Sequence, residues 1–124
     1  MVMKFMKLSN VVTLIQGKVI SNSYNPDTDV KGGCGADLMS DVLASTQPDS
    51  ILLTGLCNPQ VVRTAQIADV RAIIFVRGKT PPQETIELAL QESIPLFSTP
   101  LGMFEACGRL YEAGLPSYEG LYDL

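Results

Sequence analysis

The second half of the chain repeats one pattern three times: an apolar segment, a short polar connection, and then asparagine or threonine followed by proline. The apolar segments are residues 51–54, 72–76 and 96–98, and the polar–proline pairs are Asn58-Pro59, Thr80-Pro81 and Thr99-Pro100. A capping side chain before proline is typical of a helix start. Strands that alternate with helices through short connections form a mainly parallel sheet, because the crossovers are right-handed. The repeat therefore predicts a three-layer α/β/α fold, with a mainly parallel sheet between two layers of helices.

The N-terminal part predicts a short helix, a strand and a turn. Ser9 is a candidate cap for a helix over residues 10–16, and Gly17 is a candidate left-handed stop for it. Residues 18–21 predict a strand and residues 25–27, Asn-Pro-Asp, a turn.

Four residues, Gly32-Gly33-Cys34-Gly35, follow an extended piece around Val30. They match neither the dinucleotide-binding nor the Walker A glycine pattern, so we interpret them as a tight turn from strand to helix. A helix is then predicted from Ala36 to Thr46. Asp37 and Asp41 lie one turn apart on its polar face and could hold a divalent cation, but an ordinary solvated face is our preferred interpretation.

The last predicted helix follows Thr99-Pro100 and runs to about Ala113. Its apolar residues at helical spacing predict a buried face, and Gly114 predicts its end; the residues expected to be buried are Leu101, Phe104, Cys107 and Tyr111. We therefore expect one domain over residues 1–114 and a C-terminal tail, docked or flexible, over residues 115–124.

Composition excludes several classes of function. The net charge is −4 and the pI is about 4.6, which disfavours binding to nucleic acid. The longest apolar run, residues 72–76, is too short to cross a bilayer, and the start of the chain lacks the features of a signal peptide, so we expect a cytoplasmic protein. The sequence contains no histidine, which removes the usual general base and the commonest metal ligand.

The three cysteines, Cys34, Cys57 and Cys107, are dispersed and form no C-x-x-C motif. Such spacing does not predict a disulfide framework or a metal site, which usually needs four Cys or His ligands. Cys57 lies beside a predicted helix N-terminus, where the pKa of a thiol is often lowered. A redox-sensing role for Cys57 is one interpretation, and an unreactive thiol is the one we prefer.

The ends of the predicted parallel strands are the expected place for a ligand, because ligands of open α/β sheets bind beyond the carboxyl ends of the strands. The free N–H groups of the following helices suit an anion, and Arg77 and Lys79 add positive charge there. No catalytic or metal-binding set is predicted. The candidate ligand-binding residues are Thr54, Gly55, Asn58, Arg77, Gly78 and Thr99. The alternative is that these ends are purely architectural, since all proteins of this class have them.

Four stretches carry a family resemblance: residues 30–43, 51–55, 72–78, and 94–100 followed by Phe104. In this order and spacing they resemble the DRTGG domain family over about Lys7 to Gly114. The Asp-Arg pair of the family would fall near Leu56-Cys57, and its Thr-Gly-Gly at residues 76–78, which keep one glycine. The resemblance implies a fold like the N-terminal domain of HPr kinase. It also implies regulation and subunit contact, because in HPr kinase, phosphotransacetylase and CBS-containing pyrophosphatase this region accompanies a separate catalytic domain.

We therefore expect a non-catalytic regulatory module without a cofactor, a homodimer that senses a small anionic metabolite or nucleotide and acts on a regulatory partner protein. The helix over residues 36–46 or the last helix is the expected dimer contact. Some short single-domain members of the family carry names that refer to iron–sulfur hydrogenases. The alternative function is thus an iron–sulfur or redox-sensing protein of hydrogenase systems, with cysteines pooled across a dimer. A small phosphotransfer enzyme that uses Asp37 or Asp41 is a third hypothesis.

Overall fold

A five-stranded sheet forms the centre of the computed structural model, which describes residues 5–21 and 24–117. Its strand order is β2-β7-β6-β5-β4. The parallel strands are β4 (Gly32–Gly35), β5 (Ser50–Thr54), β6 (Ala72–Phe75) and β7 (Leu96–Ser98), and β2 (Lys18–Val19) is antiparallel to β7. A small antiparallel pair, β1 (Met6–Lys7) and β3 (Asp29–Val30), lies outside this sheet. The prediction of a mainly parallel sheet is confirmed.

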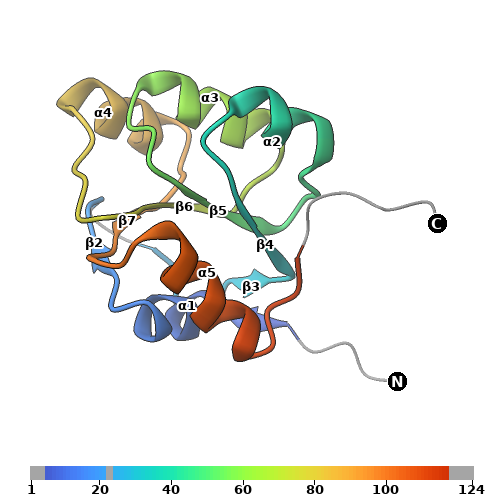
Figure 1. Cartoon of the computed structure of the whole chain (residues 1–124). Helices are drawn as coiled ribbons and strands as arrows, with labels where there is room; N and C mark the ends of the chain where they lie inside the picture. Colours follow the sequence, from blue (N-terminus) through green and yellow to red (C-terminus); the bar gives the residue numbers. More distant parts are fainter. Residues whose placement is uncertain (1–4, 22–23, 118–124) are drawn as a thin grey trace.

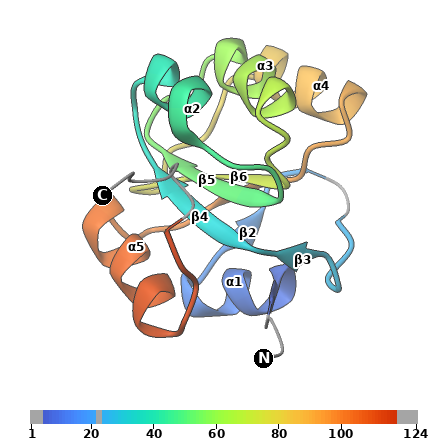
Figure 2. The same cartoon turned by 90° about the vertical axis from the view of Figure 1, so that its right-hand side faces the viewer.

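Helices cover both faces of the sheet (Figures 1 and 2). One face carries α2 (Met39–Ser45), α3 (Pro59–Ile67) and α4 (Gln83–Gln91), and the other carries α1 (Leu8–Leu14) and α5 (Met103–Glu112). The predicted three-layer architecture is therefore confirmed. Within the described part of the chain, no helix has the length and apolar character needed to span a membrane.

Alternate residues of the strands pack into two separate cores. Ile51, Leu53 and Ile74 belong to the core under α1 and α5, whereas Leu52 and Ile73 belong to the core under the other three helices. Because both faces are buried, the strands need apolar side chains at every position. This requirement is why the strands appear in the sequence as uninterrupted apolar runs.

The chain changes face once in the parallel part of the sheet. From β4 to β7 each strand pairs with the next one along the chain, and α2, α3 and α4 all return over the same face. After β7 the chain crosses to the opposite face and forms α5 (Figure 1). The connections after β6 and β7 therefore leave in opposite directions, which is the arrangement where α/β sheets commonly bind ligands.

The predicted turn at Gly32–Gly35 is wrong, because these residues form the edge strand β4. The glycines serve packing instead of a turn. A Cβ added to Gly35 would lie 2.8 Å from the Sγ atom of Cys107, and one added to Gly33 would lie 3.3 Å from Leu115. Glycine at both positions lets α5 and the segment after it approach the strand.

Two of the three predicted cap–proline pairs are wrong. Helix α4 begins at Gln83 after Pro82, and α5 begins at Met103 after Gly102, so neither Thr80 nor Thr99 is a cap. Asn58 does occupy the position before Pro59 at the start of α3, although its side chain makes no capping hydrogen bond. Proline marks the approach to each helix here, and the start itself lies up to three residues further on.

The first helix is also shifted from its predicted place. It begins at Leu8 with Lys7 before it, so Ser9 lies inside the helix and is not its cap. Gln16, with φ of 56°, takes the left-handed conformation that we expected of Gly17. Gly17 instead packs against Val12, because a Cβ there would lie 3.2 Å from the side chain of that residue.

The buried face of α5 is not the predicted one. Phe104 is 94% exposed and Tyr111 is 71% exposed, whereas Ala106 and Leu110 are buried. Leu101 and Cys107 are partly buried against the same core. Gly114, with φ of 107°, follows the helix as predicted.

The start of the predicted tail packs on the domain. Leu115 is buried, and the Gly33 N–H donates a hydrogen bond of 3.0 Å to the Pro116 carbonyl. The remainder of the predicted tail, residues 118–124, lies outside the described residues.

We predict that Thr99→Val destabilises the fold by about 2 kcal/mol or more. The buried Thr99 hydroxyl donates to the Ile15 carbonyl at 2.6 Å and accepts from the Leu101 N–H at 3.2 Å, so valine would leave two backbone groups without a partner. Thr64→Val is the matched control, since the Thr64 hydroxyl is buried with no partner among the described residues. We expect this variant to be neutral or more stable by about 1 kcal/mol. Urea unfolding of both variants measures the difference, and equal losses would contradict the assignment.

Candidate functional site

Asp37 is fixed to the carboxyl end of β5. One oxygen of its carboxylate, Oδ1, accepts a hydrogen bond of 2.7 Å from the Gly55 N–H and one of 3.2 Å from the Thr54 hydroxyl. The Thr54 hydroxyl also accepts from the Leu56 N–H at 3.1 Å, and Thr54 is fully buried. Asp37 and Thr54 thus hold the loop after β5, and Asp37 does not pair with Asp41 as a cation site would need.

Lys79 reaches the same loop from the end of β6. Its ammonium group donates a hydrogen bond of 3.1 Å to the Gly55 carbonyl. The ion pairs within the described chain involve other cations, namely Lys7, Lys31, Arg71 and Arg109. Neither Lys79 nor Arg77 therefore has a described carboxylate within ion-pair distance, so both keep positive charge available at this edge.

Arg77 and Gly78 form a tight turn directly after β6. Their φ values are 61° and 66°, and the Lys79 N–H closes the turn on the Val76 carbonyl at 3.3 Å. Two consecutive residues with positive φ are typical of a type I′ turn. This conformation is costly for arginine, by about 1–2 kcal/mol, yet the Arg77 side chain is exposed.

Backbone hydrogen bonds join this turn to the connection after β7. The Arg77 N–H donates to the Leu101 carbonyl at 2.8 Å, and the Gly78 N–H donates to the Thr99 carbonyl at 2.7 Å. The N–H groups that could have met an anion here are therefore used within the fold. The side chains of Arg77 and Lys79 add charged donors at this edge.

The six residues selected from the sequence do not form one cluster. Thr54 and Gly55 share the Asp37 and Lys79 contacts, and Arg77 and Gly78 follow the neighbouring strand. Thr99 is buried and its hydroxyl contacts backbone, and Asn58 is exposed at the start of α3. Two further residues of this edge, Asp37 and Lys79, are not among the six. The sequence indicated Asp37 only as a possible cation ligand, and the charge of Lys79 at a strand end was the signal that could have identified it.

Cys34 and Cys107 both line the space between β4 and α5, whereas Cys57 lies just before α3. Cys34 belongs to the core under α2 and α3, whereas Cys107 packs in the core on the other side of the sheet. Burial raises the pKa of the Cys57 thiol, and the nearby charge of Lys79 only partly opposes this. A protonated thiol is a poor nucleophile, so the Cys57 environment disfavours redox sensing. No group of three or more His, Cys, Asp or Glu side chains suited to a metal ion occurs among the described residues.

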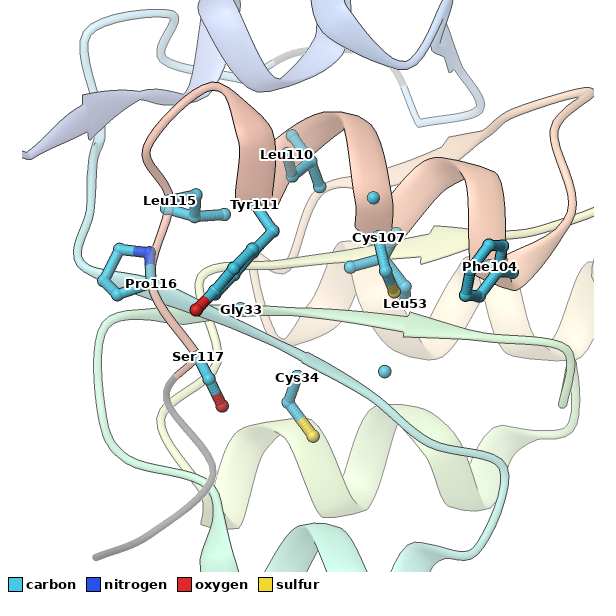
Figure 3. A pocket seen from close by; sticks show the side chains of 12 residues that line it. Gly33, Cys34, Leu53, Phe104, Cys107, Leu110, Tyr111, Leu115, Pro116 and Ser117 are labelled. Atoms are coloured by element: carbon cyan, nitrogen blue, oxygen red, sulfur yellow. The ribbon is translucent and has the colours of Figure 1, made fainter.

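A cavity of about 370 Å³ lies between the edge strand β4 and helix α5. We call it the β4–α5 cavity; Figure 3 shows the side chains that line it. Its apolar walls include Leu53, Leu110 and Leu115, and the exposed rings of Phe104 and Tyr111 stand beside it. Its volume is within the range of small-ligand pockets.

No protein-family model and no curated protein matches the sequence. The structure is similar to a crystal structure of the CBS and DRTGG domains of the regulatory region of a Clostridium perfringens pyrophosphatase, in complex with its activator diadenosine tetraphosphate. The TM-score is 0.69 at 23% sequence identity, over 94% of this chain and 51% of that one. This chain thus spans about half the length of that structure. The predicted resemblance to DRTGG proteins is confirmed at the level of the fold, which this chain shares with that regulatory region.

Proposed function

We propose that this chain is a non-catalytic regulatory module that binds a small anionic ligand of the adenine-nucleotide class at the carboxyl edge of its sheet. The observation that carries the proposal is Arg77: an exposed arginine in a left-handed conformation, hydrogen-bonded through its backbone to the connection after β7, where the chain changes face. Strained residues persist where the surrounding structure requires them, and they cluster at functional sites. The structurally similar regulatory region was crystallised with a dinucleotide activator, which supports a ligand of this class.

Charge at this edge favours a phosphate group. Arg77 and Lys79 flank the same turn, so two positive charges stand against the one negative charge of Asp37, whose carboxylate and the Lys79 ammonium both lie beside Gly55. A guanidinium forms charge-assisted hydrogen bonds with phosphate oxygens, each contributing about 1.5–3 kcal/mol. Thr54 and Gly55 would act indirectly, by holding the loop that Lys79 contacts.

Regulation fits the chain better than catalysis does. The sequence has no histidine, and the similar structure is a regulatory region. The family resemblance adds the expectation of subunit contact, here a homodimer, and of a regulatory partner protein. The iron–sulfur alternative has less support, because the thiols of Cys34 and Cys107 belong to opposite faces of the sheet.

We predict that Arg77→Gly separates stability from binding. Glycine adopts positive φ without strain, so the free energy of unfolding should rise by about 0.5–1 kcal/mol. Affinity for ATP or diadenosine tetraphosphate should fall about tenfold or more, because the charge-assisted contacts are lost. Thermal unfolding and isothermal titration calorimetry measure the two effects on the same sample.

Ser93→Gly is the matched control. Ser93 also has positive φ, 58°, but it follows α4 at the opposite edge of the sheet. We expect a similar gain in stability and unchanged nucleotide affinity. If the wild-type protein binds neither nucleotide nor inorganic phosphate, the edge is architectural and the ligand proposal fails. Binding that is equal in Arg77→Gly would place the ligand elsewhere.

A second prediction concerns Lys79. Lys79→Gln keeps a hydrogen-bond donor for the Gly55 carbonyl but removes the charge. We expect nucleotide affinity to weaken, and the weakening to shrink as salt increases, because exposed charges are screened. Titrations at low and high ionic strength measure this. Arg63→Gln, which removes an exposed charge from α3, is the control and should leave affinity unchanged.

A further inference from the structure

Gly108 lies in the middle of α5, where glycine is among the least favourable residues. Nothing in the described chain explains its presence. A Cβ added to Gly108 would have no described heavy atom within 4 Å, and its φ is not positive. Gly78 and Gly114 also have open space around them, but their φ values of 66° and 107° account for glycine. Neither backbone conformation nor close packing against the described residues therefore accounts for glycine at position 108.

Gly108 is exposed between two exposed aromatic side chains. Phe104 precedes it by one turn and Tyr111 follows it by nearly one turn, so the three residues share one face of the helix. Phe104 and Tyr111 are 94% and 71% exposed. Exposed aromatic rings next to a glycine are typical of a contact surface. Burial of the rings is favourable, and glycine lets another backbone come close.

The same surface combines an apolar projection and an apolar hollow. The β4–α5 cavity is lined by Gly108, Phe104 and Tyr111, together with Leu53 and Leu115 (Figure 3). An interface between two identical chains around a two-fold axis must be complementary to itself. A ring that projects next to a cavity of about 370 Å³ meets this requirement.

We propose that a second copy of this chain binds to this surface, with the two α5 helices antiparallel and crossing near Gly108. The proposal rests on the homodimer of the proposed function and names its surface. Phe104 and Tyr111 are nearly symmetric about Gly108 along the helix, so an antiparallel copy places Phe104 of each protomer beside Tyr111 and the cavity of the other. Gly108 allows the two backbones to approach.

Charge around the surface is compatible with self-association. Glu105 and Arg109, one turn apart on α5, form an ion pair of 2.7 Å. This pair neutralises itself within each chain, so Glu105 and Arg109 add no net charge where two copies would face one another. Glu112 leaves one exposed carboxylate at the C-terminal end of α5, and in an antiparallel pair it lies toward the N-terminal end of the other α5, where negative charge is favourable.

Sedimentation equilibrium of the full chain and three variants tests the surface. Gly108→Gln adds a side chain at the proposed crossing, and Phe104→Ala removes the ring that fills the partner's cavity. Each should raise the dimer dissociation constant about tenfold or more. Ile67→Ala is the control: Ile67 is 72% exposed, but on α3 across the sheet, and its removal should leave the constant unchanged.

Thermal unfolding under conditions where all proteins are monomeric adds a second readout. Glutamine is a much better helix former than glycine, so Gly108→Gln should unfold at a higher temperature than wild type while dimerising more weakly. A wild-type dimer that none of the variants weakens would overturn this surface and leave the dimer of the proposed function standing. A wild-type monomer throughout the micromolar range would overturn both, and the nucleotide titrations would still decide the ligand. If Gly108→Gln does not fold, the comparison of Phe104→Ala with Ile67→Ala decides the surface.

Discussion

The single change of face after β7 determines how the functional edge of this molecule is built. Because α4 and α5 lie on opposite faces, the connections after β6 and β7 diverge at the carboxyl edge of the sheet. In many α/β proteins backbone N–H groups between such connections meet a ligand. Here two of them, those of Arg77 and Gly78, donate to carbonyl groups of the β7–α5 connection instead. Backbone hydrogen bonds thus join the two connections, and in the proposed function the ligand contacts fall to the side chains of Arg77 and Lys79.

This arrangement gives a physical account of the strain at Arg77. Among the four other described non-glycine residues with positive φ, Gln16, Asp69 and Ser93 each follow the end of a helix, where one left-handed residue commonly terminates it. The fourth, Asp49, directly precedes β5, and its carboxylate pairs with Lys31 and Arg71. Arg77 follows a strand, and it must turn the chain so that both its own N–H and that of Gly78 reach across to the next connection. Glycine would satisfy this backbone requirement at lower cost. The backbone requirement therefore does not account for the arginine side chain, whose Nε lies 3.8 Å from the Cβ position of Gly102, just before α5.

The parts of the fold that depend on burial could be predicted from the sequence, and the parts that depend on local capping could not. Strands buried on both faces leave continuous apolar runs, so β5, β6 and β7 were located to within a residue. Thr80 and Thr99 have the sequence pattern of helix caps because each precedes a proline. The hydroxyl of Thr99 instead donates a hydrogen bond to the carbonyl of Ile15 at the end of α1. Only the tertiary structure reveals a partner so distant in sequence.

The reversed face of α5 has a related cause. Its sequence contains two stripes at helical spacing, one with Phe104 and Tyr111 and the other with Ala106 and Leu110. Hydrophobicity favours the aromatic stripe as the core, but α5 packs on β4 and β5, where Gly33 and Gly35 let the helix and the segment after it come close to the sheet. Such a close approach favours a small residue such as Ala106 at the contact. The contacts of Lys79 and Asp37 could not be predicted either. Both side chains bond to Gly55 in the loop after β5, and only the folded chain brings them to it.

The two proposed surfaces are joined by a short stretch of backbone. Leu101 accepts the N–H of Arg77, donates its own N–H to the Thr99 hydroxyl, and stands two residues before the start of α5. A ligand that displaced the Arg77 turn would have to break or carry along this hydrogen bond, and so would act on the end of the helix that bears Phe104. The proposed regulatory module would need two sites and an element that both of them bias. The connection between β7 and α5 meets this need for the two proposed surfaces, because Thr99 also bonds to Phe75 of β6 and, through its hydroxyl, to the Ile15 carbonyl after α1.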